Sequence, residues 1–459
     1  MTKKDFKNKK ITIMGLGLNR GGIGSARFFA ECGAKVLITD IKKERDLSGS
    51  LKKLKDLKIE YVLGQHRPED FKNADMIIKN PAVPAVSKYL EIARENKIPI
   101  YSDIGIFLKL CKSPIIAVTG TKGKSTTASL IYQMLQKQYE NVVLAGNIRV
   151  SVFSVLKIIK KDSLIILELS SWQLADLENI KCKPQVAVIT NIFSDHLDRH
   201  KTFKNYVQAK KNIFKSQNKN NFLVLNHDNK TCRKLAKNAL AKIIFFSLKS
   251  EVKGAHVIGN NIVFGLKKEF ICARESLNLH GKHNLANALA AITASKIYNV
   301  KTKDIKKVLK NFRGLEGRLE FVKELGQVKY YNDTCATQPD AVIAGLKIFK
   351  KPIILIAGGS DKELEFRGMA QWILKKVKTL ILLPGNGSDK IKSAIKKLGK
   401  KHWPIHEVDN MQQAVETAHK LAKPNQIVLL SPGCSSFSSF KHEFDRGDQF
   451  KKRVQSLKN

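Results

Sequence analysis

The chain has 459 residues, of which 43% are hydrophobic and 27% charged, as expected for a globular protein of about two to four domains. Its 82 Lys and Arg residues outnumber the 40 Asp and Glu residues and give a formal net charge of +42. No apolar run is long enough to span a membrane, and the seven scattered cysteines form no C-x-x-C pair, so we expect a cytoplasmic protein without a membrane span or a cysteine-ligated metal.

The charge alone allows two interpretations. A strongly basic chain can bind nucleic acid, so a nucleic-acid-binding ATPase is one alternative. However, the lysines are spread along the whole sequence and gather in no tail or aromatic-rich patch. We therefore favour a lysine-rich surface, which also suits a strongly anionic substrate, and we expect no nucleic-acid partner.

Residues 10–102 alternate between strand and helix patterns, which predicts a parallel sheet with helical crossovers. The expected strands and the clearest helices lie at 11–15, 35–39, 59–63, 75–79 and 98–101, and at 25–32 and 89–96. The first turn, GLGLNRGGIG, and Asp40 after the second strand are similar to a dinucleotide fingerprint, but Arg20 stands where its third glycine belongs. A nucleotide diphosphate held on backbone amides, with Asp40 near a sugar or base, fits the pattern equally well.

The stretch IIAVTGTKGKSTT at 115–127 predicts a phosphate loop between a strand and a helix. Gly120 and Gly123 let backbone amides approach phosphate oxygens, Lys124 can reach the terminal phosphates, and Ser125 can ligate Mg²⁺. Val118 replaces the first glycine of the longer phosphate-loop pattern, so this is the short variant T-G-T-x-G-K-[ST]-T. The stretch therefore predicts nucleotide binding.

Polar residues follow two further apolar strands of the same region. Glu168 lies at the end of a strand predicted at 164–169, where a carboxylate beside a phosphate loop can hold Mg²⁺ or simply face solvent. Asp195, His196 and Asp198 follow a strand at 186–190, although a lone histidine is more often structural than a ligand. Beyond them we expect a hairpin at 256–265 and an apolar helix at 283–298.

Residues 315–459 form a third alternating region, with a hairpin at 319–332 and strands at 353–357, 380–383 and 427–430. The loops GGSDK and SPGCSSF, at 358–362 and 431–437, follow strands at the edge where open α/β sheets bind ligands. The fold class predicted for the chain is α/β with three domains: a Rossmann-like N-terminal domain (1–110), a central P-loop ATPase-like domain with a parallel sheet (111–314) and a Rossmann-like C-terminal domain (315–459).

Taken in order, these motifs resemble the Mur ligases, ATP-dependent enzymes that build the peptide of peptidoglycan precursors. The resemblance runs from Gly15 to Arg446 through TGTKGKSTT, LELSSWQL, TNIFSDHLDRH, HNLANALAA, EGRLE, YYNDTCAT and LLSPGCSSFSSFKHEFDRG. LELSSWQL is most similar to the member that adds D-glutamate to UDP-N-acetylmuramoyl-L-alanine, and the first domain argues against the diamino-acid and dipeptide adders. The resemblance implies a ligase that forms an amide through an acyl phosphate and releases ADP and phosphate, and we expect it to be a monomer.

The resemblance also implies residue roles, with catalytic functions for Lys124, Glu168, His196 and Lys210. The implied ATP contacts are Gly120, Thr121, Lys122, Gly123, Lys124, Ser125, Thr126, Asn287, Arg318 and Asp333. Two Mg²⁺ sites are implied, one at Ser125 and Glu168 and the other at His196 and Lys210, which matches the family's carbamylated lysine. The UDP-sugar end matches Gly15, Leu16, Asp40 and Asn147, and the amino-acid end matches Thr337, Lys362, Ser436 and Phe437.

Three positions depart from the family pattern. Lys122 stands where the loop usually has Asn, Arg149 where Gly is common, and Cys335 where the family often has a Lys that helps to bind glutamate. Because Cys335 falls at the amino-acid end, a sister Mur ligase that adds a different amino acid is an alternative. A folylpolyglutamate synthetase-like enzyme is a further alternative, disfavoured because it would not need the N-terminal domain.

Overall fold

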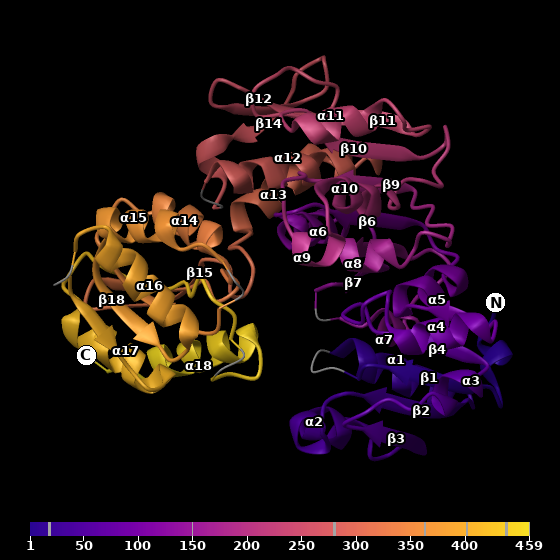
Figure 1. Cartoon of the computed structure of the whole chain (residues 1–459). Coiled ribbons are helices and arrows are strands. Elements are labelled where there is room, and N and C mark those ends of the chain that lie inside the picture. Colours follow the sequence, from indigo (N-terminus) through magenta and orange to yellow (C-terminus); the bar gives the residue numbers. More distant parts are fainter. Residues whose placement is uncertain are drawn as a thin grey trace. The chain divides into compact units, whose positions relative to one another are not determined.

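The structure is a computed structural model that describes residues 1–16, 20–148, 150–278, 281–361, 364–400, 403–436 and 439–458. The chain divides into two compact units, residues 1–312 and 313–459, and each is described by itself (Figure 1). The first unit contains two parallel sheets and a small antiparallel sheet, and the second contains one mixed sheet. No helix in the described ranges is both long and apolar enough to cross a bilayer.

The N-terminal sheet has the strand order β3-β2-β1-β4-β5, and all of its strands are parallel. The strands are β1 (Lys10–Met14), β2 (Lys35–Asp40), β3 (Ile59–Leu63), β4 (Met76–Lys79) and β5 (Ile100–Tyr101). The order reverses between β1 and β4, and an open α/β sheet binds ligands at the carboxyl ends of strands at such a point. The expected alternation is confirmed and brings the turn after β1 beside the turn after β4.

Helices cover both faces of this sheet. Apolar side chains of α1 (Arg20–Glu31) and α5 (Asp103–Leu110) pack on one face, and those of α3 (Glu69–Lys72) and α4 (Lys88–Glu95) pack on the other. Two predicted boundaries were wrong. Helix α1 begins five residues earlier than expected because Gly22, whose added Cβ would lie 2.1 Å from the Leu16 carbonyl oxygen, allows the helix to start against the turn. Strand β5 lacks residues 98 and 99 because Pro99 has no N–H for a sheet bond.

The central sheet has the order β11-β10-β9-β6-β8-β7 and is parallel throughout. Its strands are β6 (Ile115–Thr119), β7 (Val142–Gly146), β8 (Leu164–Glu168), β9 (Val186–Ile189), β10 (Phe222–Asn226) and β11 (Lys242–Phe246). Every residue of β6, β8 and β9 is buried, as expected for apolar strands covered on both faces. Helix α6 (Lys124–Leu135) packs against the apolar helix α12 (Lys282–Ile297), which was predicted at 283–298.

Shorter elements complete the first unit. The predicted hairpin is formed by β12 (Ala255–Ile258) and β13 (Asn261–Phe264), and an unpredicted third strand, β14 (Glu269–Ala273), pairs with β13. The remaining helices are α2 (Glu44–Leu51), α7 (Val152–Val155), α8 (Ser171–Ala175), α9 (Leu197–His200), α10 (Phe203–Lys211), α11 (Lys230–Ala236) and α13 (Thr302–Asn311). Phe28 of α1 stacks on Phe153 of α7 with ring centroids 4.3 Å apart, which joins the N-terminal and central sheets through aromatic packing.

The second unit is a six-stranded sheet of order β15-β16-β20-β17-β18-β19, in which only the β15–β16 pair is antiparallel. Its strands are β15 (Glu320–Leu325), β16 (Val328–Asn332), β17 (Ile353–Gly358), β18 (Val377–Leu383), β19 (Ile405–Glu407) and β20 (Ile427–Leu430). Its helices are α14 (Pro339–Ile348), α15 (Arg367–Lys376), α16 (Asn386–Lys397), α17 (Met411–Leu421) and α18 (Glu443–Gln455). Two apolar clusters, one on each face, give this unit its own core.

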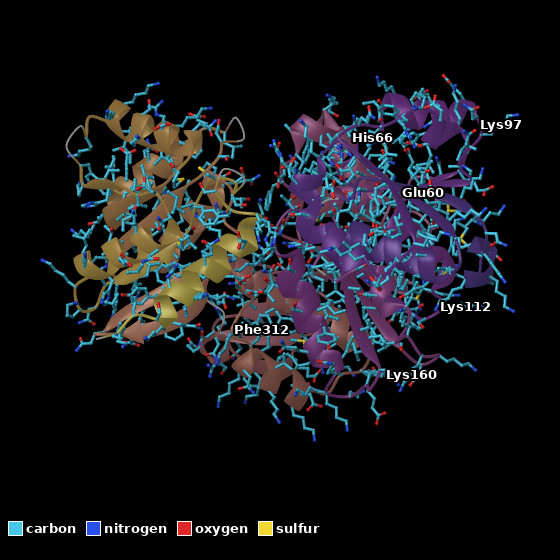
Figure 2. The ribbon with its side chains drawn as sticks, turned by 90° about the horizontal axis from the view of Figure 1, so that it is seen from below. Glu60, His66, Lys97, Lys112, Lys160 and Phe312 are labelled. Carbon is cyan, nitrogen blue, oxygen red and sulfur yellow. The ribbon has the colours of Figure 1, made fainter. Side chains whose placement is uncertain are left out.

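The basic side chains lie mainly on the surface. Lys97, Lys112 and Lys160 are exposed and extend away from the ribbon (Figure 2). Among the described residues, only two lysines, Lys79 and Lys210, are buried. The charge is therefore carried by a solvated lysine-rich surface, and the two buried lysines require a separate physical explanation.

Candidate functional site

The predicted phosphate loop connects β6 to α6, and its two glycines are required by close packing. Gly123 has φ of 84°, and a Cβ there would lie 2.0 Å from Asn287 Oδ1; a Cβ at Gly120 would lie 1.9 Å from Thr190 Oγ1. Helix α6 begins at Lys124, so its first amides and its positive dipole end meet the loop. The fold thus places Asn287, predicted as an ATP contact, directly against the loop.

Two lysines extend from this loop in different directions. The Lys124 ammonium donates to the carbonyl oxygens of Gly120 and Thr121, both at 3.0 Å. The Lys122 ammonium forms an ion pair with Asp195 at 3.3 Å, and the Lys122 amide donates to Asn191 Oδ1 at 2.9 Å. Lys122, the departure from the family pattern, therefore ties the loop to the segment that carries Asp195.

Glu168 is placed beside the loop by strand pairing, because it lies opposite Val118 in the register of β6 and β8. Its side chain is buried, and its Oε1 accepts a hydrogen bond of 3.1 Å from Asn147 Nδ2. Its other carboxylate oxygen, Oε2, is buried without a hydrogen-bond partner. A buried carboxylate oxygen without a donor is the feature expected of a cation ligand.

Lys210 lies on α10 with 1% of its surface exposed. Its ammonium donates to the Gly120 carbonyl oxygen at 2.9 Å and lies 4.8 Å from the centre of the Tyr206 ring. Burial, and after it the nearby charge of Lys124, lowers the pKa of Lys210 well below its ordinary value. Both effects favour the neutral amine over the ammonium.

His196 is exposed and has a left-handed backbone with φ of 53°. Its backbone N–H donates to Asp195 Oδ1 at 3.0 Å, and the centre of its ring lies 5.6 Å from the centre of the Trp172 ring. Within the described ranges, no three His, Cys, Asp or Glu side chains form a metal-binding group, and the Asp198 side chain lies outside them. Any Mg²⁺ here would need phosphate oxygens or water to complete its ligands, as Mg²⁺ commonly does.

The residues predicted for the UDP-sugar end lie at the carboxyl edge of the N-terminal sheet. Gly15, at φ of 88°, ends the pairing of β1, and Leu16 is buried behind it. Asp40 ends β2, and its Oδ1 accepts a hydrogen bond of 3.0 Å from the Lys42 amide. Asn147, the fourth residue predicted for this end, lies instead after β7 of the central sheet, where its side chain donates to the predicted metal ligand Glu168.

Asp333 is buried at the carboxyl end of β16 in the second unit. It accepts hydrogen bonds from the Ser431 hydroxyl at 2.8 Å and the Leu319 amide at 3.2 Å. Burial raises the pKa of Asp333 to about 7, against the opposing effect of these hydrogen bonds and the nearby Arg318. Arg318 and Asp333, both predicted ATP contacts, are therefore neighbours within this unit.

The predicted amino-acid end is only partly within the described residues. The Thr337 amide donates to the Cys335 carbonyl oxygen at 3.0 Å, and Ser436 is buried in the loop after β20. Lys362 and Phe437, and also Arg149 in the first unit, lie outside the described residues. Sequence reasoning missed Arg446, which is fully buried and donates to the Thr334 and Cys434 carbonyl oxygens at 2.9 and 3.3 Å.

Comparison with known proteins finds similar sequences along nearly the whole chain. Three family models match consecutive segments: the MurD-like N-terminal domain of Mur ligases at residues 9–102, the Mur ligase middle domain at 118–295 and the Mur ligase glutamate ligase domain at 317–434. A Roseiflexus protein called UDP-N-acetylmuramoylalanine–D-glutamate ligase is 40% identical over 98% of this chain and 99% of its own length. A Clostridium botulinum protein with the same name is 38% identical over 99% of this chain and 98% of its own.

Solved structures share the fold at lower sequence identity. The UDP-N-acetylmuramate-alanine ligase MurC of Thermotoga maritima is 19% identical with a TM-score of 0.66, and the alignment covers 98% of this chain and all of that one. The MurF ligase of Thermotoga maritima, solved in complex with ADP, is 18% identical with a TM-score of 0.58 and coverage of 92% and 95%. The α/β architecture predicted from the sequence is therefore confirmed.

Proposed function

The chain belongs to the Mur ligase family, and from this membership we propose that it joins D-glutamate to UDP-N-acetylmuramoyl-L-alanine at the expense of ATP. The observation that carries the proposal is the identity of 38–40% to D-glutamate ligases along 98–99% of the chain. The product would be a peptidoglycan precursor, and cytoplasmic location and a monomeric state stay predictions.

ATP would bind with its phosphates on the loop from Gly120 to Thr126. The positive φ of the loop glycines and the start of α6 at Lys124 support this placement, because both direct backbone N–H groups toward an anion. Asn287 lies against Gly123 and is placed to contact the nucleotide. Arg318 and Asp333 are proposed as further ATP contacts.

The residues near the loop fit Mg²⁺. The buried Glu168 oxygen without a hydrogen-bond donor and the nearby Ser125 hydroxyl at the start of α6 are oxygen ligands of the kind that Mg²⁺ prefers. When bound, Mg²⁺ neutralises the charge on the phosphate oxygens and orients them for in-line attack. His196 and Lys210 are proposed for a second site.

Carbamylation of Lys210 is part of the same proposal. CO₂ adds only to a neutral amine, and both the burial of Lys210 and its lowered pKa favour that form. The resulting carbamate would carry a negative charge near the phosphates, where an ammonium would repel a metal.

The reaction then depends on positioning more than on covalent participation by the protein. The L-alanine carboxylate of the UDP-substrate attacks the γ-phosphorus of ATP, ADP leaves, and an acyl phosphate forms. The neutral amine of D-glutamate then attacks the acyl carbon, inorganic phosphate leaves with the bonding electrons, and the amine gives up a proton. Lys124 would stabilise charge on the transferred phosphoryl group, and Asn147, proposed for the UDP-sugar, holds the Glu168 carboxylate by a hydrogen bond.

The sugar and amino-acid ends follow from the two outer sheets. Gly15 and Leu16 are proposed for the UDP-sugar because they follow β1 at the strand-order reversal of the N-terminal sheet, and Asp40 because it ends the neighbouring strand β2 at the same edge. Thr337 and Ser436, together with Lys362 and Phe437 outside the described residues, are proposed for D-glutamate.

A panel assay of phosphate release tests the proposal. ATP and UDP-N-acetylmuramoyl-L-alanine are supplied with one amino acid at a time, and we expect release to depend on D-glutamate. Release with another amino acid would identify a sister ligase, which Cys335 makes the natural alternative. Release that needs no amino acid would contradict ligase activity, and Lys124→Ala is the inactive control.

A further inference from the structure

A turn at residues 80–83, which we call the 80–83 turn, follows β4 and is held by two cationic side chains. The Lys79 ammonium donates to the carbonyl oxygens of Asn80 and Val83 at 3.4 and 3.2 Å. The Arg199 guanidinium donates to those of Pro81, Ala82 and Val83 at 2.9, 3.0 and 2.6 Å. Each of the four backbone carbonyls therefore accepts a bond from a cation.

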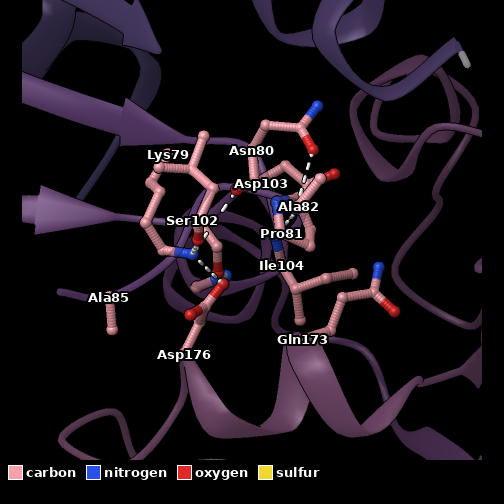
Figure 3. Close-up of polar contacts among 12 residues, drawn as sticks. Lys79, Asn80, Pro81, Ala82, Ala85, Ser102, Asp103, Ile104, Gln173 and Asp176 are labelled. Atoms are coloured by element: carbon pink, nitrogen blue, oxygen red, sulfur yellow. Dashed lines mark hydrogen bonds and ion pairs between the residues drawn. The ribbon is translucent and has the colours of Figure 1, made fainter. Parts of the chain in front are cut away.

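On its other side the turn is bonded to the predicted UDP-sugar site. Asn80 Nδ2 donates to the Gly15 carbonyl oxygen at 3.2 Å. Asn80 Oδ1 accepts from the Ala82 amide at 3.0 Å, as Figure 3 shows. The position of the backbone after β1 is thus linked to the position of the turn after β4.

Arg199 connects the turn to the phosphate side of the site. It belongs to α9, which begins directly after His196, and its guanidinium lies 5.1 Å from the centre of the Trp172 ring. Trp172 also contacts the His196 ring, and it lies on α8, shortly after Glu168. One arginine therefore contacts the turn on the N-terminal domain and the tryptophan that packs against a predicted metal ligand.

Lys79 supplies a second anchor between the same two domains. Its ammonium forms an ion pair of 2.9 Å with Asp176, the residue that follows α8, and the pair is almost fully buried (Figure 3). The burial of Lys79 is therefore explained by these contacts between the two domains. Because Lys79 anchors only the ends of the turn, the middle of the turn is held across the domain boundary by Arg199.

We propose that Arg199 is a positioning residue for the ligase reaction. It fixes the 80–83 turn against α9, so that the substrate bound at Gly15 keeps its position relative to the phosphate groups near His196. The inference rests on the proposed function. A guanidinium presents five donors in a planar fork, which lets one side chain bond three carbonyls at once, whereas a lysine ammonium cannot reach all three in a fixed geometry. A displacement of about 1 Å between reacting groups can lower a rate by about 10²-fold.

The test compares Arg199→Met and Arg199→Lys with Arg94→Met as a matched control. Arg94 also bonds a carbonyl after β4, that of Ala85 at 2.7 Å, but it makes this bond within the N-terminal domain. We expect kcat to fall about 10²-fold in Arg199→Met while KM for ATP changes less than about threefold, because the loop contacts are intact. Arg199→Lys should recover about tenfold of the loss, and Arg94→Met should stay within about twofold of the wild type.

A second readout does not require turnover. In a Trp372→Phe, Trp403→Phe background, Trp172 is the remaining tryptophan and reports on the environment under Arg199. UDP-N-acetylmuramoyl-L-alanine should change the Trp172 emission when Arg199 is present. In Arg199→Met the emission change should be lost although calorimetry still detects binding.

Two results would overturn the positioning role of Arg199. One is wild-type kcat in Arg199→Met, and the other is a lowered kcat in Arg199→Lys together with raised KM values for all three substrates and a lowered thermal midpoint. If Arg199→Met does not fold, Arg199→Lys provides the test. A lowered kcat with little change in KM for ATP supports the positioning role, whereas a kcat equal to that of the wild type contradicts it. Absence of D-glutamate-dependent turnover in the wild type would instead refute the proposed function, and the fluorescence titration would still test the contact.

Discussion

Lys210→Arg keeps a positive charge at a position where the proposed mechanism needs a negative one. Arginine cannot form a carbamate, because its guanidinium stays protonated at any accessible pH. The substitution therefore separates a requirement for a buried cation from a requirement for the modified lysine. Lys210→Met serves as the neutral comparison.

The structure sets the size of the expected effect. The ammonium groups of Lys124 and Lys210 donate to the same Gly120 carbonyl oxygen at 3.0 and 2.9 Å, so the two nitrogen atoms lie within about 6 Å of each other. At an effective dielectric constant of about 20, two like charges at that separation repel by about 3 kcal/mol, and a carbamate reverses the sign of the interaction. We expect kcat to fall by about 10³-fold or more in Lys210→Arg, equivalent to about 4 kcal/mol.

Two assays check this expectation. Phosphate release with all substrates measures kcat, and nuclear magnetic resonance with isotope-labelled bicarbonate detects a carbamate carbon in the wild type but not in Lys210→Met. A short carboxylate added to Lys210→Ala should restore part of the activity, whereas it should not rescue Lys210→Arg. Full activity of Lys210→Arg, or a wild type without a carbamate signal, would refute the carbamate.

Four further predictions concern other residues. Lys124→Ala should abolish ATP turnover and leave UDP-substrate binding within about threefold, because the loop and the predicted UDP site lie on different sheets; calorimetry showing equal loss of both in a folded protein would count against this. Lys79→Met should lower the free energy of unfolding, measured by urea denaturation, by about 3–5 kcal/mol because it leaves Asp176 buried without its cation. The double variant with Asp176→Leu should regain most of the lost stability. The pKa of Asp333 is about 7 in the folded protein and about 3.8 in the unfolded chain. Its contribution to the free energy of unfolding is therefore complete below pH 3.8 and is lost as the pH rises through 7. Asp333→Asn should lack this pH-dependent contribution when urea denaturation is measured across the pH range. Cys335→Lys should stay active with a lower KM for D-glutamate, and an inactive but folded variant would show that the pocket is built differently.

The sheets could be predicted because burial leaves a direct mark on sequence. Strand β8 is a run of apolar residues that ends in Glu168, and every one of its positions is buried. The phosphate loop could also be predicted, because its glycines and Lys124 have a fixed spacing in the sequence. Strand β14 was missed because its charged start, beside Lys267 and Lys268, is similar to the solvated loops elsewhere in this chain.

The interdomain contacts could not be predicted in the same way. Lys79 and Asp176 are far apart in sequence, and neither differs in pattern from the many surface lysines and acids of the chain. Arg199 lies within TNIFSDHLDRH, but its bonds are made to backbone carbonyls, which leave no trace in side-chain identity. The one available signal was positional, since Asn80 directly follows a strand at the ligand-binding edge of its sheet.

Direct detection of the product tests the central claim. The protein is incubated with ATP, Mg²⁺ and UDP-N-acetylmuramoyl-L-alanine together with equal amounts of D- and L-glutamate, one of them isotope-labelled, and the UDP-linked product is separated and weighed by mass spectrometry. We predict a single new species that contains one glutamate and carries the label only when the D-enantiomer is labelled. Label from L-glutamate in the product, or no UDP-linked amide while ATP is consumed, would contradict the assignment.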